Sequence, residues 1–289
     1  MKGAKGDRAS AFRNGPRTLA IDVGGTGVKA SVLDRAGRML VKRVRVATPY
    51  PCRHKILLLA TADLTASLPP FNRIFIGFPG VIRDGRVLTA PHFDLAAWRD
   101  CLLEEAVSRR FSKPARLLND AEVQGLGVVA GRGFEVVLTL GTGVSSAVFS
   151  NGALAPHHEL AQHPIHKGET YNDDIGNEAR LAHGSKKWNR RVLNMIEIVH
   201  SLLHYDVLYL GGGNAANLVV DLPDNVRVAS TDAGIMGGIR LWDEKFWHSV
   251  RDSEARDGRD ASAIGRFARI VAAPRRQSAP PPARAATTA

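Results

Sequence analysis

The sequence predicts an α/β protein of two lobes, each built on a mixed β-sheet flanked by helices, and two observations lead to this prediction. A strand, a glycine-rich turn and a second strand occur twice, at residues 19–33 and 137–149. After each turn, further apolar strands alternate with helical segments, which is the order of a duplicated α/β fold. The 289 residues, of which 44% are hydrophobic, are enough for one large or two modest domains with a real core.

Both turns have the composition of a phosphate-binding loop. Glycine lets backbone N–H groups converge on an anion, because it has no Cβ to obstruct the approach. Neither turn ends as a Walker A loop does, and a strand rather than a helix follows each, which excludes the dinucleotide fingerprint. The residues predicted to contact phosphate are Gly24, Gly25, Thr26, Gly27, Lys29, Gly141, Thr142 and Gly143.

Apolar periodicity predicts the remaining elements. In the first half we expect strands at 39–46, 73–78 and 115–118 and helices at 55–67 and 98–111. In the second half we expect helices at 121–130 and 186–204 and a strand at 207–210. Gly211, Gly212 and Gly213 follow that strand, and a glycine run between a strand and a helix predicts a phosphate contact at the helix N-terminus.

The two ends of the chain differ from its body. The formal net charge is +11, and most of the excess Lys and Arg lies before Thr18 and from His248 onward. Such dispersed charge favours solvation over nucleic-acid binding. We expect a disordered basic extension at 1–17, an N-terminal lobe at 18–118, a C-terminal lobe at 119–247 whose last helix packs back on the first, and a disordered Pro- and Ala-rich tail at 248–289.

The sequence shows neither a membrane span nor a signal peptide, so we expect no membrane contact and a cytoplasmic location. Cys52 and Cys101 are the only two thiols, and we expect both to be reduced. Two thiols exclude a disulfide framework and argue against a cysteine zinc cluster.

Seven short segments, taken in order, resemble the ROK family. They lie between Thr18 and Trp242 and are 22–29, 77–80, 119–122, 140–143, 159–160, 211–213 and 232–237. Within the family the chain looks most like the polyphosphate glucokinase branch, because of its first glycine turn, its Pro-Gly loop, the short gap between Glu159 and the long helix, and the lack of a Cys-rich zinc segment. The resemblance implies the actin-like ATPase fold of sugar kinases, Hsp70 and actin, with a hexose, ATP or inorganic polyphosphate, Mg²⁺ and a homodimer.

Asp120 is the residue that we expect to act as the catalytic base. A kinase must remove a proton from the sugar hydroxyl as the phosphoryl group arrives, and a carboxylate in the cleft can accept it. The alternative is that Asp120 only caps the following helix. Asp22 is predicted to hold Mg²⁺, directly or through water, because a carboxylate beside a phosphate turn repels the anion unless a cation intervenes. Its alternative is an ordinary turn aspartate.

The resemblance also implies a sugar site that contains Gly80, Asn119, Asp120 and Glu159. Two positions in that site depart from the family pattern. Gln162 stands where relatives have a histidine, and His92 stands where they have an asparagine. Because a sugar site rejects a wrong isomer through unpaired polar groups, these changes leave the identity of the sugar open.

Two further clusters have more than one interpretation. Four histidines lie between residues 157 and 166, and His163 and His166 have a spacing that suits a pair of metal ligands. Without a thiol or an HExxH pattern, we interpret them as loop and sugar-contact residues. Four Lys and Arg residues at 186–191 form a basic strip that is either a solvated helix face or a contact for polyphosphate.

These observations predict a hexose kinase that uses polyphosphate or ATP. The alternative is an inactive sugar-binding sensor of the same fold, although a pure binder has no chemical need for Asp22, Asp120 and the second glycine turn. An actin-like ATPase or assembly protein is a third interpretation. It is disfavoured because Asn119 and Glu159 are groups suited to a sugar.

Overall fold

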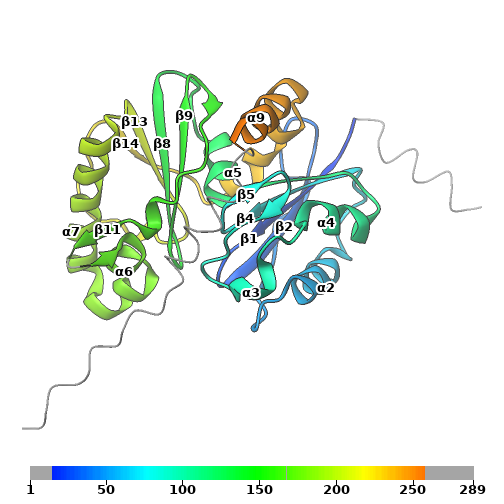
Figure 1. The fold of residues 1–289 in the computed structure, drawn as a ribbon, viewed down its shortest axis with the longest axis horizontal. Helices are drawn as coiled ribbons and strands as arrows, with labels where there is room; N and C mark the ends of the chain where they lie inside the picture. The colour runs from blue at the N-terminus through cyan, green and yellow to red at the C-terminus, as the bar shows by residue number, and fades with distance from the viewer. Residues whose placement is uncertain (1–14, 167, 258–289) are drawn as a thin grey trace, which may run out of the picture.

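The structure is a computed structural model that describes residues 15–166 and 168–257. Two five-stranded sheets stand apart, with helices on their outer faces, and α5 (Asp120–Leu126) lies between them (Figure 1). No helix in these described ranges is long and apolar enough to cross a membrane.

The first lobe is the sheet of strand order β3-β2-β1-β4-β7 with the helices that cover it. β1 (Thr18–Val23) and β2 (Gly27–Leu33) form the antiparallel pair around the first glycine turn, and β3 (Val44–Ala47) pairs with β2. β4 (Arg73–Phe78) and β7 (Ala115–Asn119) continue the sheet parallel to β1. Nearly every residue of β1 and β4 is buried, as expected for strands covered on both faces.

The second lobe is the sheet of strand order β10-β9-β8-β13-β14 with its helices, and it repeats the first arrangement. β8 (Phe134–Leu140) and β9 (Val144–Ser150) are antiparallel around the second glycine turn, and β10 (Ala153–Leu154) pairs with β9. β13 (Val207–Gly211) and β14 (Val226–Val228) run parallel to β8. The predicted duplication of a mixed sheet is therefore confirmed.

Helices and short elements complete both lobes. The first lobe carries α2 (His54–Thr65), α3 (Leu95–Trp98), α4 (Leu103–Phe111) and the hairpin of β5 (Ile82–Arg83) and β6 (Arg86–Val87). The second carries η1 (Leu160–Gln162), β11 (Pro164–His166), β12 (Glu169–Thr170), α6 (Tyr171–Ile175), α7 (Asn177–Leu203) and η2 (Ala215–Asn217). The chain then returns between the lobes through α8 (Ala233–Met236), η3 (Gly237–Trp242) and α9 (Glu244–Asp257).

Several predicted elements differ from the structure, and the helix expected at 121–130 ends at Leu126. The helix expected at 98–111 is divided into α3 and α4, with Asp100 between them at a φ of 58°. The long helix starts at Asn177 rather than at 186, and it is broken at Gly184, whose φ of 73° is not helical. The strand expected at 39–46 is shorter and later, because Met39 forms only an isolated bridge with Leu33.

The glycine run after β13 also leads to a different element. The turn is followed by η2, a single 3₁₀ turn of three residues, and not by the helix that was predicted there. That prediction was wrong, because the backbone N–H of Asn214 donates to Leu140 and ties this segment to the end of β8.

α5 is packed on all sides. Its residues from Ala121 to Leu126 are buried, and they join a core that includes Phe75 of the first sheet and Phe149 of the second. At Gly125 a Cβ would run into the ring of Phe149, so this position needs a glycine for close approach of β9. The N-terminus of α5 is therefore held rigidly between the lobes.

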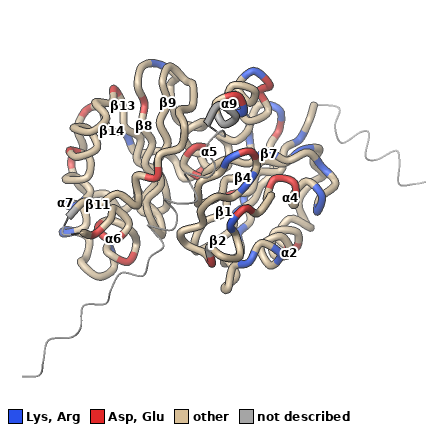
Figure 2. The backbone as a smooth tube through the Cα atoms, viewed as in Figure 1, with Lys and Arg blue, Asp and Glu red and all other residues tan. Residues whose placement is uncertain are grey.

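α9 extends past the predicted boundary at residue 247. Trp247 and Val250 are 8% and 5% exposed, which gives this segment an apolar face to bury. Arg251 donates to Glu104 of α4 over 2.7 Å, and residues of opposite charge lie side by side in this region (Figure 2). The tail predicted to begin at 248 is thus helical to Asp257. The rest of the tail and residues 1–14 lie outside the described residues.

Candidate active site

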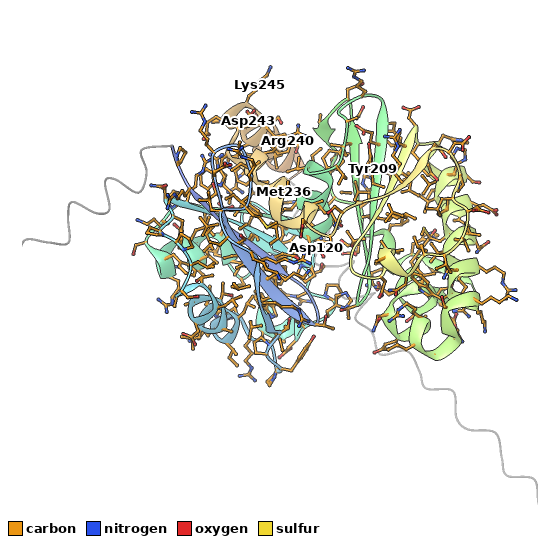
Figure 3. The ribbon with its side chains drawn as sticks, turned by 180° about the vertical axis from the view of Figure 1, so that it is seen from behind. Asp120, Tyr209, Met236, Arg240, Asp243 and Lys245 are labelled. Atoms are coloured by element: carbon orange, nitrogen blue, oxygen red, sulfur yellow. The ribbon has the colours of Figure 1, made fainter. Side chains whose placement is uncertain are left out.

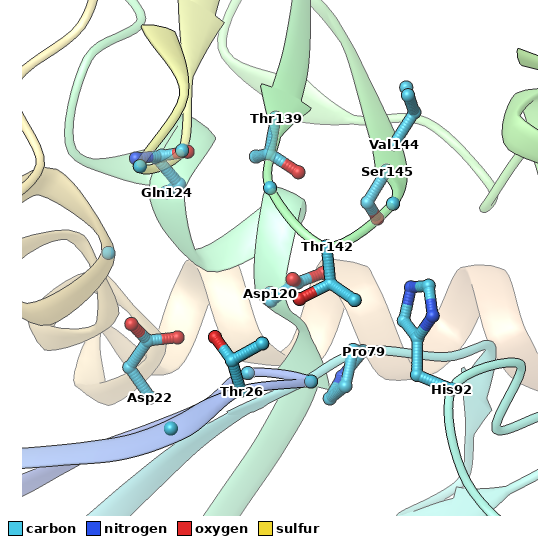
Figure 4. Close-up of a pocket in the computed structure, with 18 of the residues that line it drawn as sticks. Asp22, Thr26, Pro79, His92, Asp120, Gln124, Thr139, Thr142, Val144 and Ser145 are labelled. Carbon is cyan, nitrogen blue, oxygen red and sulfur yellow. The ribbon is translucent and has the colours of Figure 1, made fainter. Parts of the chain in front are cut away.

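The two glycine turns meet across a cleft between the lobes (Figure 4). Each turn is closed by one backbone bond, from Gly24 to Gly27 over 3.0 Å and from Gly141 to Gly143 over 2.9 Å. A Cβ at Gly25 would lie 2.9 Å from Oγ1 of Thr142, closer than real Cβ atoms come to their neighbours. Glycine at position 25 is therefore what allows the first turn to touch the second.

A cavity of about 380 Å³ lies between these turns. Its lining brings together most of the residues that the sequence singled out. These are Asp22, Gly24, Gly25, Thr26, Gly27, Lys29, Gly80, His92, Asn119, Asp120, Gly141, Thr142, Gly143, Glu159, Gly212 and Gly213.

Two of the predicted site residues do not line this cavity. Gln162 ends the 3₁₀ turn η1, beside Glu159 in the chain but outside the lining. Gly211 ends β13 outside the lining, and a Cβ there would collide with the side-chain amide of Gln124. Gln124 itself reaches the lining in its place.

Asp120 is the first residue of α5 and lies in the space between the two sheets (Figure 3). Burial, first, and the negative charge of Asp22 raise its pKa to about 6, although a hydrogen bond with Ser145, the N–H of Ala121 and the charge of His157 act in the opposite direction. A carboxyl with this pKa is mostly ionised at neutral pH and still accepts a proton readily, as a general base must.

Asn119, and not Asp120, caps α5. Its Oδ1 accepts from the N–H of Ala121 over 2.8 Å and from Ser145 Oγ over 3.1 Å, while its Nδ2 donates to the carbonyl of Gly80 over 3.1 Å. The N-cap position that the alternative prediction gave to Asp120 thus belongs to Asn119, although Asp120 Oδ1 also accepts the N–H of Ala121 over 2.9 Å. Asn119 fixes the helix start, the loop after β4 and β9 at one point.

Asp22 is paired inside the cavity. Lys29 Nζ donates to its Oδ2 over 2.8 Å, and the two residues face each other across β1 and β2. This pair puts a cation and an anion beside the first glycine turn. Oδ1 of Asp22 is not used by Lys29, so the carboxylate keeps an oxygen for a cation with its own water shell.

Side chains of α6 and of the segment between β13 and η2 hold the second turn in place. Asn172 Oδ1 accepts from the N–H of Val144 over 2.6 Å, and Asn214 Nδ2 donates to the carbonyl of Gly141 over 3.0 Å. A Cβ at Gly143 would lie 2.5 Å from both Asn172 and the ring of His92. His92 therefore contacts this turn, and burial lowers the pKa of its imidazole.

The histidines of 157–166 separate into different environments. His158 and His163 are exposed, whereas the side chain of His157 is buried beside Glu122. Over the part of the chain that the structure describes, no group of three or more His, Cys, Asp or Glu side chains could hold a metal ion. The side chain of His166 is outside the description.

Several lining residues were missed by the sequence analysis. Arg43 and Arg45 lie beside the first turn, where Arg45 donates to the carbonyl of Thr26 over 3.1 Å. The alternation of basic and apolar residues before Thr48 was the available signal, since it places these side chains on one face of an edge strand. Ser145 and His157 gave no comparable signal, because each acts through a partner distant in sequence.

The basic strip at 186–191 lies on α7, outside the lining of the cavity. Arg191 is paired with Asp174 over 2.9 Å, while Lys186, Lys187 and Arg190 are exposed. The cations that line the cleft are instead Lys29, Arg43 and Arg45.

The fold and the cleft define an actin-like α/β protein with two glycine turns over one carboxylate. Residues 18–159 match the model of the ROK family, which confirms the resemblance seen in the motifs. The polyphosphate glucokinase of Mycobacterium tuberculosis is 28% identical over 211 residues, which are 68% of this chain and 77% of that protein.

Solved structures agree with this assignment. The inorganic polyphosphate/ATP-glucomannokinase from Arthrobacter sp. strain KM has a TM-score of 0.71 at 27% identity, over 78% of this chain and 97% of that one. A ROK family glucokinase from Streptomyces griseus, solved in complex with glucose and AMPPNP, has a TM-score of 0.66 at 19% identity, over 78% and 98% of the two chains. At that identity, the second comparison supports the fold alone.

Proposed function

We propose that this protein is a hexose kinase that transfers a phosphoryl group from polyphosphate or ATP to a sugar hydroxyl. The observation that carries the proposal is the contact of two glycine turns over Asp120, a partly buried carboxylate whose pKa is raised to about 6. The relatives named polyphosphate glucokinase and polyphosphate/ATP-glucomannokinase support it, and they favour an enzyme over an inactive sensor.

In this proposal Asp120 accepts the proton of the sugar hydroxyl that attacks the phosphoryl group. Asn119, Glu159, the Gly80 loop and His92 line the same cavity and are proposed to hold the sugar. Planar amide and carboxylate groups suit adjacent hydroxyls, because each offers two polar atoms. Gln162 lies outside the lining, so we propose no direct sugar contact for it.

The donor phosphates are proposed to lie against the N–H groups of both turns, with the hydroxyls of Thr26 and Thr142 and the ammonium of Lys29 beside them. Gly212 and Gly213 extend this surface along the second lobe. These neutral donors and single cations can bind the terminal phosphates of either polyphosphate or ATP, because both present the same group there.

Asp22 is the residue proposed to hold Mg²⁺. The donor set fits this ion, since Mg²⁺ in phosphoryl-transfer sites is held by one or two carboxylates and keeps several waters. Once bound, Mg²⁺ would neutralise charge on the transferred phosphate.

The proposal is tested by a coupled assay on purified protein with Mg²⁺, in which glucose, mannose, fructose and N-acetylated hexoses are each offered with ATP and with polyphosphate. We expect sugar phosphate to form with at least one hexose and one donor. Sugar binding by calorimetry without turnover under any of these conditions would favour the sensor instead. A cytoplasmic location and a homodimer stay predictions.

A further inference from the structure

His157 lies behind the cavity wall, between two carboxylates. Its Nδ1 is 2.9 Å from Oε1 of Glu122, and its Nε2 is 3.8 Å from Oε2 of Glu159. The side chains of His157 and Glu122 are 7% and 6% exposed, whereas that of Glu159 is 29% exposed and lines the cavity. The imidazole thus connects the interior of the protein with the proposed sugar site.

Glu122 links His157 to the start of α5. Its other oxygen, Oε2, accepts the backbone N–H of Asn119 over 3.0 Å and completes the capping box of this helix. Asn119 is the residue before Asp120. One carboxylate therefore contacts both the imidazole and the helix cap that sets the position of the proposed base.

The arrangement favours a charged imidazole. Each ring nitrogen faces a carboxylate, and only the protonated ring carries an N–H on both sides. Burial lowers the pKa of His157, but its hydrogen bond with Glu122 and its charge interactions with Glu122 and Glu159 outweigh burial and raise the pKa to about 10. The charged or titratable groups around this ring are Glu122 and Asp120 on α5 and Glu159 before η1.

We propose that His157 is a positioning residue, an imidazolium that holds Glu159 in the orientation needed for the sugar and connects it through Glu122 to the cap of α5. This inference rests on the proposed kinase function. The cation lets a second carboxylate stand near Glu122 in a buried region, where two unpaired anions would repel each other. Glu159 then keeps its Oε1 for hydroxyls of the sugar.

The charge of His157 also reaches the proposed base. It favours the ionised form of Asp120 and so opposes the increase in pKa that burial and Asp22 cause. Removing the charge raises the pKa of Asp120, which means that the base form appears only at a higher pH. A role limited to packing would leave this pH dependence unchanged.

The test compares His157→Gln with the matched control His158→Gln, whose side chain is exposed one position further along. For His157→Gln we expect KM for the sugar to increase about tenfold with little change in KM for the donor, because the ion pair with Glu159 on the sugar side is lost. We also expect the acid limb of kcat/KM to move up by roughly half to one pH unit. The control should match wild type in both.

A folded His157→Gln variant with the KM and pH profile of the wild type would overturn the inference. If that variant does not fold, the proposal can be tested on the wild-type protein. Nitrogen NMR of its histidines reports the charge of each ring without any substitution. In the wild type we expect the signal of one protonated ring to persist from pH 6 to 9. In Glu122→Gln we expect no signal of a protonated ring at pH 9. A wild-type spectrum in which every histidine is neutral at pH 9 would refute the proposal, whether or not the protein phosphorylates a sugar.

Discussion

The two glycine turns occupy equivalent places in the two lobes, but the residues paired behind them differ. Behind the first turn, Asp22 of β1 stands opposite Lys29 of β2, and the two form an ion pair. Behind the second turn, Thr139 of β8 stands opposite Ser145 of β9, and both carry neutral hydroxyls into the cavity. The same strand-turn-strand unit therefore carries charged side chains in the first lobe and neutral hydroxyl groups in the second.

This difference indicates a division of roles. The charged turn suits the phosphate chain and its cation, whereas the hydroxyl of Ser145 contacts Asn119 and acts on Asp120. A second ion pair at the position of Thr139 and Ser145 would place another charge beside the base and alter its pKa. The duplicated fold thus supplies two turns for phosphate. Because Thr139 and Ser145 replace the ion pair in the second lobe, the pKa of the proposed base is not changed by a further charge.

The largest effect is expected at Asp120, which both turns face. Asp120→Asn should lower kcat by about 10³-fold, because the amide cannot accept the proton, while sugar binding measured by calorimetry stays within about threefold of wild type. In the wild type, kcat/KM should fall as the pH drops through about 6, where this carboxyl becomes protonated. Near-normal turnover by the asparagine variant would remove the assignment of the base.

The next effect tests the charge of the first turn against the neutral second turn. Asp22→Asn should lower kcat by about 10²-fold and increase the Mg²⁺ concentration needed for half-maximal rate, since the proposed metal ligand loses its charge. Thr139→Val at the equivalent place should leave the Mg²⁺ dependence unchanged. Equal Mg²⁺ titration curves for Asp22→Asn and wild type would argue that the first turn holds no cation.

Contact between the turns is tested at Gly25. Gly25→Ala places a Cβ 2.9 Å from Oγ1 of Thr142, so the lobes must separate slightly, and kcat/KM should fall about tenfold. Thr142→Ala removes the two outer atoms that the new methyl group meets. The double variant should then recover part of what Gly25→Ala alone loses, and strict additivity in the rates would show that the turns do not touch in the working enzyme.

The structure also explains which parts of the site could be predicted. Local patterns identified the two turns, Asn119 and Asp120, because a strand, its turn and the next helix cap are adjacent in sequence. Gly211 was misassigned because it is one of three consecutive glycines. Unlike the other two it ends β13 against Gln124 and does not line the cavity. His157 was not distinguished from His158, since only the position of Glu122, 35 residues earlier, separates a buried ion pair from an exposed ring.

The fold was predicted more completely than the site for a related reason. Strand order follows from a repeated pattern of apolar residues, so one correct lobe implies the other. The helix breaks at Asp100 and Gly184 depend on single left-handed residues, and a non-glycine residue such as aspartate gives little local warning of that conformation.

A smaller effect separates the cleft cations from the basic strip on α7. Arg45→Gln should increase KM for polyphosphate about fivefold, because its guanidinium lies beside the first turn. Lys187→Gln, on the exposed face of α7, is the matched loss of one charge and should change KM less than twofold. A larger effect for Lys187→Gln, increasing with polyphosphate chain length, would assign the donor path to the strip instead.

The smallest effect is expected at Ser145, the neutral counterpart of Lys29. Ser145→Ala removes the hydroxyl that donates to Asn119 and helps to keep the pKa of Asp120 down. The acid limb of kcat/KM should therefore move up by roughly half a pH unit, while the plateau rate at high pH falls only about threefold. Ser145→Thr is the control, since it keeps the hydroxyl at a similar place and should keep the wild-type limb. A limb that moves down in Ser145→Ala would mean that the hydroxyl destabilises the ionised base, and the second turn would then not have the role assigned to it.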